Sequence, residues 1–262
     1  MNKNNNDWKL WPKCTSYGDL LFKRAKGELP EMESSKSLVK VMKNIFKSGM
    51  SILDVGCGAG HYYRTFLKTW SGNLEYYGVD ATEYYIKLAK KAFGDMKDRF
   101  SVGDIYNLSF SDNSFDMVIS CNLLLHLPSI SKPINECIRV AKKYVIFRTL
   151  VGNSTYIIKQ VRNKNHGKEH DVDPADELDN NGNPRIFNFF NIYSRDYITG
   201  CIKKAKKNCK VEFIEDLNFN KKAIMKSHKK EYKGRMGTTR IVDDRQVVDD
   251  IICNWNFVKI TL

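Results

Sequence analysis

Apolar residues follow two rhythms along the first 150 residues of the chain. Short apolar runs typical of buried strands lie at 51–55, 74–79, 100–102, 116–121 and 144–150. Between these runs, apolar residues recur every three or four positions, which indicates helices with one buried face. Strands that alternate with helices predict a doubly wound α/β fold, in which helices cover both faces of a mostly parallel sheet.

The flanking segments extend this pattern at both ends. Before it, residues 19–26 are predicted to form two helical turns. An amphipathic helix follows, which Ser34 or Ser35 can cap and Gly49 can end. After it, the pattern predicts a helix from Ser194 to about Asn208, a strand at 211–216, a helix at 245–253 and a strand at 255–262. The sheet is therefore expected to hold seven strands.

Two long polar segments interrupt the second half of the chain. Residues 152–192 follow the fifth predicted strand, and residues 217–250 follow the sixth. Long segments without a clear pattern are usually functional when they occur in compact domains. We therefore expect residues 1–50 to form a helical cap or lid and residues 51–262 to form the core, with insertions at about 152–192 and 217–250 that shape a substrate site.

A glycine-rich turn follows the first strand. Asp54 lies in the strand, Gly56, Cys57, Gly58 and Gly60 form the turn, and a helix then begins. Alternating glycines allow a tight turn and a close approach of a ligand to the backbone. The dinucleotide fingerprint needs a glycine at position 61, where this chain has histidine, and the Gly-Lys-Ser/Thr of a P-loop is missing. A carboxylate before the turn suits a ligand with a positively charged amine, and S-adenosylmethionine carries one.

In these residues the chain resembles the class I S-adenosylmethionine-dependent methyltransferases, in particular their small-molecule (type 11-like) branch. The resemblance covers about residues 34–150 and is weaker beyond them. It implies a Rossmann-like fold, S-adenosylmethionine as the cofactor and methyl transfer as the reaction. In that family the strand acid and the turn glycines contact the methionine part of the cofactor, and Asp54, Gly56, Gly58 and Gly60 occupy those positions, with Cys57 between them.

Two further acids follow at the ends of later strands. Asp80, with Ala81 beside it, closes the second strand, and a carboxylate there can accept hydrogen bonds from both ribose hydroxyls of an adenosine. By the resemblance, Asp104 would bind the adenine amino group and Ile105 would pack on the ring. The alternative is structural, because aspartates commonly end strands and begin turns.

The residues after the fourth strand point to the site of methyl transfer. Asn122 should lie at the carboxyl end of the sheet, beside the methyl group of the cofactor. His126, a few residues later, could be a base or a substrate ligand, or a structural histidine. His61 and the pair His166/His170 are the other candidate bases, which would help most if the acceptor is a hydroxyl.

Composition changes this picture mainly through charge. The 262 residues include 43 Lys and Arg against 30 Asp and Glu, a formal net charge of +13. This balance favours an acidic partner, although an AT-rich gene would also enrich lysine. The basic run at 221–235 has three interpretations: a phosphate-binding surface, an RNA-binding surface or a solvated helical face.

Cysteine usage and hydropathy narrow the class of protein further. The seven cysteines include no Cys-x-x-Cys pair, so neither a disulfide framework nor a structural zinc site is predicted. The His166/His170 stretch reads as a solvated loop rather than a metal site, and no metal is expected. Residues 1–14 lack a signal-peptide pattern, and no run approaches the roughly 20 apolar residues that cross a bilayer. We therefore expect a cytoplasmic protein without a membrane span.

The acceptor is only partly constrained by the sequence. Enzymes that methylate amino groups of nucleic-acid bases typically place Asn/Asp-Pro-Pro-Tyr/Phe after the fourth strand, where this chain has Ser120-Cys121-Asn122-Leu123. We expect methyl transfer to a hydroxyl or amine of a small, anionic or sugar-like acceptor, such as a nucleotide-linked sugar or a phosphorylated metabolite. An RNA methyltransferase that uses the basic 218–240 stretch and a non-catalytic S-adenosylmethionine-binding module are the alternatives.

Overall fold

The computed structural model of the protein describes residues 15–71, 73–161, 178–217, 239–242, 245–248 and 251–262. Three of the sequence-based predictions concern positions outside these residues. They concern the lack of a signal-peptide pattern in residues 1–14, the His166/His170 pair and the basic run at 221–235.

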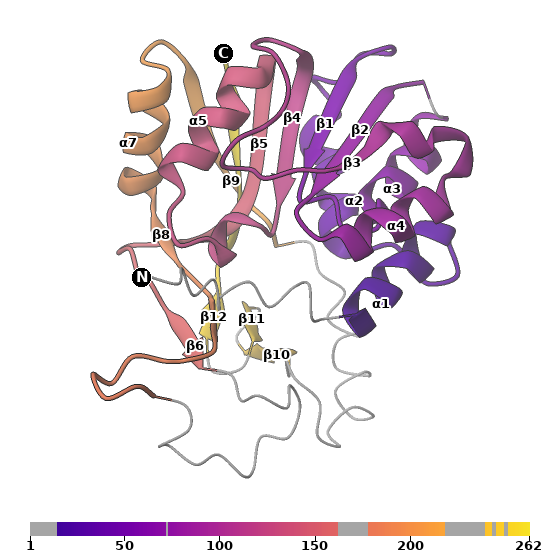
Figure 1. Cartoon of the computed structure of the whole chain (residues 1–262). Helices are drawn as coiled ribbons and strands as arrows, with labels where there is room; N and C mark the ends of the chain where they lie inside the picture. Colours follow the sequence, from indigo (N-terminus) through magenta and orange to yellow (C-terminus); the bar gives the residue numbers. More distant parts are fainter. Residues whose placement is uncertain (1–14, 72, 162–177, 218–238, 243–244, 249–250) are drawn as a thin grey trace.

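One sheet of eight strands forms the centre of the fold (Figure 1). Its path runs through β3 (Phe100–Val102), β2 (Glu75–Asp80), β1 (Ser51–Val55), β4 (Phe115–Cys121), β5 (Ala141–Gly152), β13 (Trp255–Thr261) and β9 (Lys210–Glu215). The short β8 (Tyr193–Ser194) pairs with the end of β5. Only β13 runs antiparallel to its neighbours on this path. The predicted doubly wound, mostly parallel sheet is confirmed, with β8 as a strand beyond the predicted seven.

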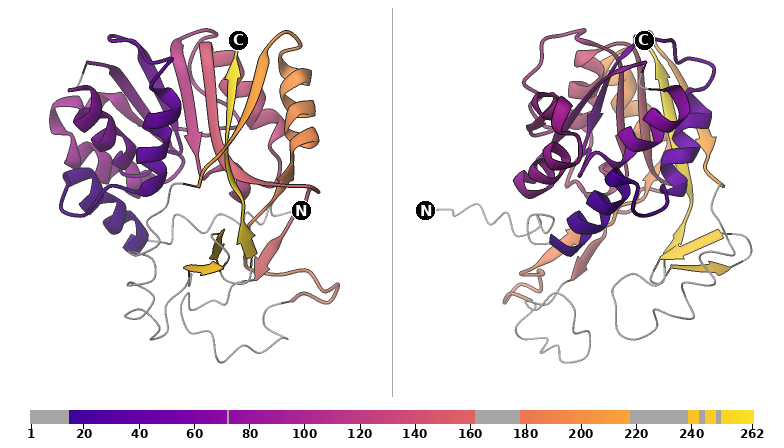
Figure 2. Two further views of the ribbon diagram at one scale, coloured as in Figure 1. Left: turned by 180° about the vertical axis from the view of Figure 1, so that it is seen from behind. Right: turned by 90° about the vertical axis from the view of Figure 1, so that its right-hand side faces the viewer.

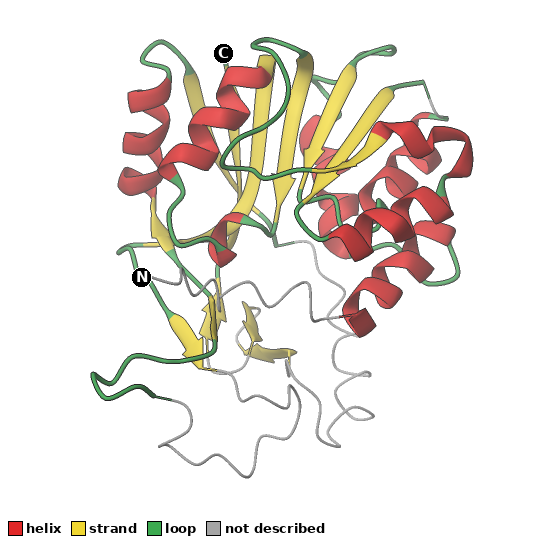
Figure 3. Ribbon diagram, in the orientation of Figure 1, coloured by secondary structure: helices red, strands yellow, loops and turns green. Residues whose placement is uncertain are grey.

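Helices cover both faces of this sheet (Figure 3). The helices α2 (Glu33–Met42), α3 (His61–Trp70) and α4 (Glu83–Ala92) share one apolar cluster with Ile52 of β1. The helices α5 (Ser131–Val140) and α7 (Arg195–Ala205) share the other with Leu53. Successive residues of a strand point to opposite faces, so adjacent apolar residues of β1 serve the two layers.

The N-terminal helix α1 (Thr15–Lys26) packs against α3 and α4, near the carboxyl ends of the parallel strands. It starts earlier than the two helical turns predicted at 19–26. Two short 3-10 segments complete the core, η2 (Gly94–Arg99) before β3 and η3 (Leu124–His126) after β4. Helix α1 therefore lies over the edge of the sheet where the glycine turn is found.

Two small sheets lie beyond the same edge of the central sheet (Figures 1 and 2). One pairs β6 (Lys159–Val161) with β7 (Phe187–Phe189), and the other contains β10 (Thr239–Val242), β11 (Arg245–Val248) and β12 (Ile251–Cys253). They fall largely within the segments at 152–192 and 217–250. The chain after β5 thus returns twice to the carboxyl ends of the parallel strands.

The helix predicted at 245–253 is wrong, because the structure has β11 and β12 there. Its apolar residues are Val247, Val248, Ile251 and Ile252, and these β-branched residues favour strands. Their spacing of three and four residues also fits a helical face, so periodicity alone gave the wrong element. The antiparallel pairing with β10 and β12 determines the outcome.

The predicted caps of α2 are also wrong. The helix begins at Glu33 after an extended Met32, and Ser34 and Ser35 lie buried inside its first turn. The acidic side chain of Glu33 in that turn complements the helix dipole in place of a hydroxyl cap. The helix ends at Met42 rather than at Gly49.

Among the described residues, none of the helices combines the length and the apolar character that crossing a bilayer requires.

Candidate functional site

The glycine turn joins β1 to α3 and lies under α1. The backbone N–H groups of Gly56 and Cys57 donate to the carbonyl oxygen of Val79, at 2.8 and 3.0 Å, which ties the turn to β2. Gly58 has a φ of +56°, and a Cβ there would lie 2.8 Å from Cδ1 of Leu21 in α1. The positive φ favours glycine, and any side chain here would also have to displace Leu21. The turn is therefore held close against the N-terminal helix.

The side chain of Cys57 points away from the turn into the core. It is buried, and its Sγ lies 2.9 Å from where a Cβ of Gly78 would be. Burial raises the pKa of its thiol well above the usual value. Cys57 can therefore contact a ligand in the turn only through its backbone.

Asp54 is a buried carboxyl group in the strand before the turn. It is 2% exposed, and the hydroxyl of Tyr76 donates to its Oδ2 at 2.6 Å. Burial raises the pKa of Asp54 to about 7; the bond from Tyr76 lowers this pKa, and the nearby charge of Asp80 raises it. Asp54 thus takes up or loses a proton near neutral pH, and a cation beside it would favour the ionised form.

Asp80 ends β2 directly beside the turn. Its Oδ2 accepts from the Gly58 N–H at 3.0 Å, and its Oδ1 accepts from the Thr82 N–H at 2.8 Å. Burial raises the pKa of Asp80, while these two backbone donors lower it. Each carboxylate oxygen has a second lone pair that can accept from a ligand hydroxyl. Ala81, the next residue, is exposed.

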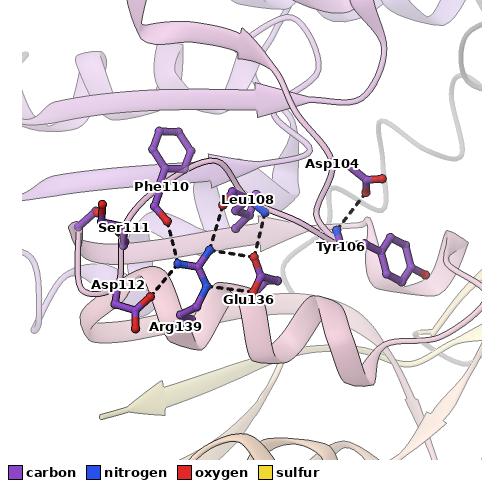
Figure 4. A network of polar contacts seen from close by, with 9 residues as sticks. Asp104, Tyr106, Leu108, Phe110, Ser111, Asp112, Glu136 and Arg139 are labelled. Atoms are coloured by element: carbon purple, nitrogen blue, oxygen red, sulfur yellow. Dashed lines mark hydrogen bonds and ion pairs between the residues drawn. The ribbon is translucent and has the colours of Figure 1, made fainter.

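Asp104 follows the next strand of the sheet. The pairing of β2 with β3 sets Asp80 opposite Val102, and the Gly103 N–H donates to the carbonyl oxygen of Asp80 at 3.1 Å. The Asp104 side chain is exposed and accepts from the Tyr106 N–H at 3.0 Å (Figure 4). Ile105 is 6% exposed and belongs to the core cluster, so at most an edge of its side chain faces a ligand.

The loop after Asp104 is clamped to α5 by an ion pair that sequence reasoning missed (Figure 4). Arg139 donates to the carbonyl oxygens of Phe110 and Leu108, at 2.7 and 2.9 Å, and to the carboxylate of Asp112. It also pairs with Glu136, whose carboxylate accepts from the Leu108 N–H at 2.9 Å. The spacing of three residues on a helix was the available signal.

Replacing Arg139 with methionine is expected to destabilise the protein by about 2 kcal/mol, because two carbonyl oxygens and the buried Glu136 carboxylate lose their charged donor. The melting temperature should fall by roughly 5 °C in thermal unfolding followed by circular dichroism. Lys142→Met, exposed in β5 just after the helix, is the matched control. Equal melting temperatures for the two variants would show that the clamp carries no stability.

The end of β4 holds the predicted residues for methyl transfer. Asn122 is partly exposed and has a φ of +60°, an uncommon value for a residue other than glycine. His126 lies one short turn later, in η3, and its Nδ1 is 2.9 Å from the carbonyl oxygen of Phe189 in β7. The structure therefore brings both residues to the carboxyl edge of the sheet, with β7 beside the histidine.

The glycine turn is also flanked by two buried nitrogen atoms, one on the predicted candidate base His61 and one on Arg24, which sequence reasoning did not pick out. Within the described residues, neither Nε of Arg24 nor Nδ1 of His61 has a hydrogen-bond partner. Burial and, to a smaller extent, the nearby Arg24 charge together lower the pKa of His61 to about 3. His61 is thus neutral and a weak base near neutral pH, but it adjoins the turn together with a cation from α1.

A second missed group lies between β5 and the end of β9. Arg148 is buried, and its Nε donates to Oδ2 of Asp216 at 2.7 Å. A charged residue inside the apolar run at 144–150 was the available signal, but its partner is 68 residues away along the chain. Among the described residues, no group of three or more His, Cys, Asp or Glu side chains could hold a metal ion.

Comparison with known sequences points to one family. The methyltransferase domain family matches residues 53–147. A sterol 24-C-methyltransferase of Gibberella zeae is 36% identical over 106 residues, which cover 38% of this chain and 27% of that protein. A 2-methyl-6-phytyl-1,4-hydroquinone methyltransferase of Synechocystis sp. is 35% identical over 95 residues, which cover 36% of this chain and 29% of that protein. The chain thus spans less than a third of the length of these curated relatives.

Solved structures agree in fold. An S-adenosylmethionine-dependent methyltransferase of Thermotoga maritima has a TM-score of 0.52 at 15% identity, covering 98% of this chain and 99% of that one. Phosphoethanolamine N-methyltransferase 2 of Haemonchus contortus was solved with phosphomonomethylethanolamine and S-adenosylhomocysteine. It has a TM-score of 0.54 at 17% identity, and the match covers 86% of this chain and 52% of that one. The segment that matches the methyltransferase domain family includes the glycine turn and the strand-end carboxylates, and the fold of the chain resembles that of the Thermotoga maritima methyltransferase over nearly its whole length.

Proposed function

We propose that the protein transfers the methyl group of S-adenosylmethionine to a hydroxyl of a small acceptor. The observation that carries this proposal is the Asp80 carboxylate, which the backbone N–H groups of Gly58 and Thr82 hold beside the glycine turn. A carboxylate fixed in this way can accept from both ribose hydroxyls while the turn borders the methionine part. Asp104 at the end of the next strand would then meet the adenine.

The reaction needs little covalent chemistry from the protein. The acceptor oxygen forms a bond to the methyl carbon, the carbon–sulfur bond breaks, and its electron pair neutralises the sulfonium. The hydroxyl proton leaves to a base. Holding the oxygen in line with the breaking bond and excluding water therefore supply most of the acceleration. Asn122 and His126, at the end of β4, are the proposed residues on this side of the cofactor.

His126 is the proposed base. The carbonyl oxygen of Phe189 lies 2.9 Å from Nδ1, which supports the tautomer that carries its proton on Nδ1. Nε2 then has the lone pair that accepts a proton. His61 is a poorer candidate because its pKa lies far below neutral.

For His126→Gln we expect kcat to fall about 100-fold, with the affinity for S-adenosylhomocysteine unchanged, because general base catalysis typically contributes a factor of this size. Calorimetry gives the affinity, and transfer of labelled methyl to the acceptor gives the rate. An unchanged rate would rule out a base at this position.

Arg24 and His61 would bind the carboxylate of the methionine part. Their buried Nε and Nδ1 atoms adjoin the turn, and a carboxylate would give both a partner. In Arg24→Met, the affinity for S-adenosylhomocysteine should fall about tenfold, the loss of one charge-assisted hydrogen bond. The affinity for 5′-methylthioadenosine, which lacks the amino-acid part, should not change. Lys23→Met, exposed on the same helix, is the control. An equal loss for both ligands would contradict this role.

The identity of the acceptor is proposed from charge and from exposed apolar residues. The net charge of +13 supports an anionic or sugar-like acceptor such as a nucleotide-linked sugar or a phosphorylated metabolite. Exposed apolar side chains on the segments after β5 favour a second candidate, an acceptor with an apolar chain; they are Tyr156, Ile157, Leu217 and Ile252. Both sequence relatives described above are named for lipophilic acceptors.

The test is a transfer assay with S-adenosylmethionine labelled in its methyl group. The panel contains nucleotide sugars, phosphorylated metabolites, a sterol, a prenylated hydroquinone and total RNA. We expect label in a small molecule. Label in RNA alone would favour the RNA methyltransferase that the basic 218–240 stretch suggested. Cofactor binding with no transfer to any of these acceptors would favour a binding module.

A further inference from the structure

Asn122 at the end of β4 is held by a buried arginine. The Nη1 of Arg148 in β5 donates to the side-chain Oδ1 of Asn122 at 2.5 Å. The backbone N–H of Asn122 donates to the carbonyl oxygen of Arg148 at 2.9 Å. The two residues therefore fix each other through backbone and side chain, at the place where Asn122 adopts its positive φ.

Arg148 is in turn held by residues from the C-terminal part of the chain. Its Nε donates to Asp216, just after β9, and the side chains of the pair are 9% and 2% exposed. Its guanidinium lies 4.1 Å from the ring centre of Trp255, the first residue of β13. Neither Asp216 nor Trp255 belongs to the segment at 53–147 that matches the methyltransferase family.

On its other side, Asn122 faces α3, the helix that follows the glycine turn. Its Nδ2 lies 3.5 Å from the hydroxyl of Tyr62, which donates to Oγ of Ser34 in α2 at 2.8 Å. Tyr62 is in the first turn of α3, directly after the glycine turn. The polar contacts thus run without a break from Asp216 through Arg148, Asn122 and Tyr62 to Ser34.

The chemistry of arginine determines how Asn122 is oriented. A guanidinium only donates hydrogen bonds, so Asn122 must present its oxygen to Arg148 and its NH2 group to the opposite side. The ion pair itself is weak support for stability, because burying two charges cancels most of their attraction. What the pair does supply is one fixed orientation of the Asn122 amide at the edge of the sheet.

We propose that Arg148, held by Asp216 and Trp255, is a positioning residue that fixes the Asn122 amide so that its NH2 group donates to the acceptor oxygen. This inference rests on the proposed function. An amide has two N–H donors; one lies toward Tyr62, and the other binds one lone pair of the oxygen while a second lone pair attacks the methyl carbon. The acceptor class is therefore one that presents an oxygen at this point, and Asp216 makes the chain after β9 part of the transfer site.

The first test measures the orientation of Asn122 without any acceptor. The side-chain amide signal of Asn122 in 15N NMR spectra of the full chain is assigned by its loss in Asn122→Asp. In the unsubstituted protein the N–H of this group that lies toward Tyr62 should exchange with water more slowly than a free side-chain amide, because the network fixes that side of the partly exposed Asn122. In Asp216→Asn its exchange should be about tenfold faster or more, whereas Glu215→Gln, an exposed neighbour in β9, should leave it unchanged. Equal exchange in all three proteins would overturn the proposal.

The second test separates positioning from a merely structural role. In Asp216→Asn, S-adenosylhomocysteine should bind within about threefold of the unsubstituted protein, while kcat at saturating S-adenosylmethionine falls about tenfold or more. Asn122→Asp keeps a partner for Arg148 but removes the NH2 donor, so it should show the same loss of kcat with a normal affinity. An unchanged kcat in either variant would overturn the positioning role. If the unsubstituted protein transfers no methyl group at all, the proposed function fails instead, and the NMR exchange still decides whether the network orients Asn122.

Discussion

Asp80→Ala should lower the affinity of the protein for S-adenosylhomocysteine about a hundredfold or more. The variant removes a carboxylate that would accept from two ribose hydroxyls, and each hydrogen bond to a charged group contributes about 1.5 kcal/mol or more. Two such bonds correspond to a factor of about 100 in the dissociation constant. The variant also removes the acceptor of the Gly58 and Thr82 N–H groups, so the turn itself loses two of its contacts.

Comparing two ligands tests whether the loss of affinity in Asp80→Ala comes from the ribose. 5′-Methylthioadenosine has the ribose but lacks the amino-acid part, so Asp80→Ala should weaken it as strongly as S-adenosylhomocysteine. Asp95→Ala, an exposed acid in η2, should change neither affinity. Isothermal titration calorimetry measures the affinity of both ligands for the unsubstituted protein and for both variants. A loss of less than about threefold in Asp80→Ala would mean that the ribose is bound elsewhere, and the cofactor site would have to be reassigned.

The sequence predicted the part of the site that depends on local order along the chain. Asp54, the glycine turn, Asp80 and Asp104 each lie at or just after the end of a strand, and the carboxyl ends of parallel strands meet at one edge of a sheet. Once the strands were recognised, it followed that these residues lie close together. The observed pairing of Asp80 with Val102 brings Asp104 near, as the order of the elements predicts.

Contacts between distant parts of the chain could not be predicted in this way. Arg148 shows in the sequence as a charge within an apolar strand, but nothing local says that Asp216 is its partner. Similarly, nothing local in the sequence places Leu21 of α1 over Gly58 or Arg24 near His61. These contacts depend on how β9 and α1 fold back onto the core, which is a property of the whole chain.

The errors in secondary structure have a related cause. At 245–253 the β-branched residues fit a helical face as well as a strand, and pairing with β10 decides between the two. At α2, the hydroxyls of Ser34 and Ser35 were expected to cap the helix, but they bond instead to Tyr62 and Thr65 of α3. In both places a tertiary contact overrides a local preference.

The affinity for S-adenosylhomocysteine is expected to rise about a hundredfold between pH 5 and pH 7.5, because only the ionised form of Asp54 attracts the ammonium group of the ligand. With a pKa of about 7, Asp54 is roughly 1% ionised at pH 5, and the apparent affinity scales with that fraction, so an uncharged residue at position 54 should lower the affinity by about the same hundredfold. Binding should release one proton at pH 6, which calorimetry detects by comparing buffers of different ionisation enthalpy. 5′-Methylthioadenosine, without an ammonium group, should show no such dependence.

The same carboxyl group should act on stability with the opposite sign. Its pKa is about 7 in the folded protein, against a usual value of 3.8 for an aspartate. A carboxyl group whose pKa is raised by folding stabilises the folded state at low pH, and this contribution is lost as pH rises from about 4 to about 7. At pH 8 the ligand-free protein therefore holds a buried charge whose only described hydrogen-bond donor is Tyr76.

Asp54→Asn separates the two effects, because the amide oxygen can still accept from Tyr76 while the charge is gone. At pH 8 the ligand-free variant should melt at a higher temperature than the unsubstituted protein, yet bind S-adenosylhomocysteine about a hundredfold more weakly. Its affinity should no longer change between pH 5 and pH 7.5. Glu75→Gln, exposed at the start of β2, is the control for removing an acid nearby in sequence. A pH dependence that persists in Asp54→Asn would assign the titration to another group. A variant that is less stable at pH 8 would mean that the Asp54 charge is favourable in the folded protein, because Tyr76 and further contacts then offset the loss of its hydration.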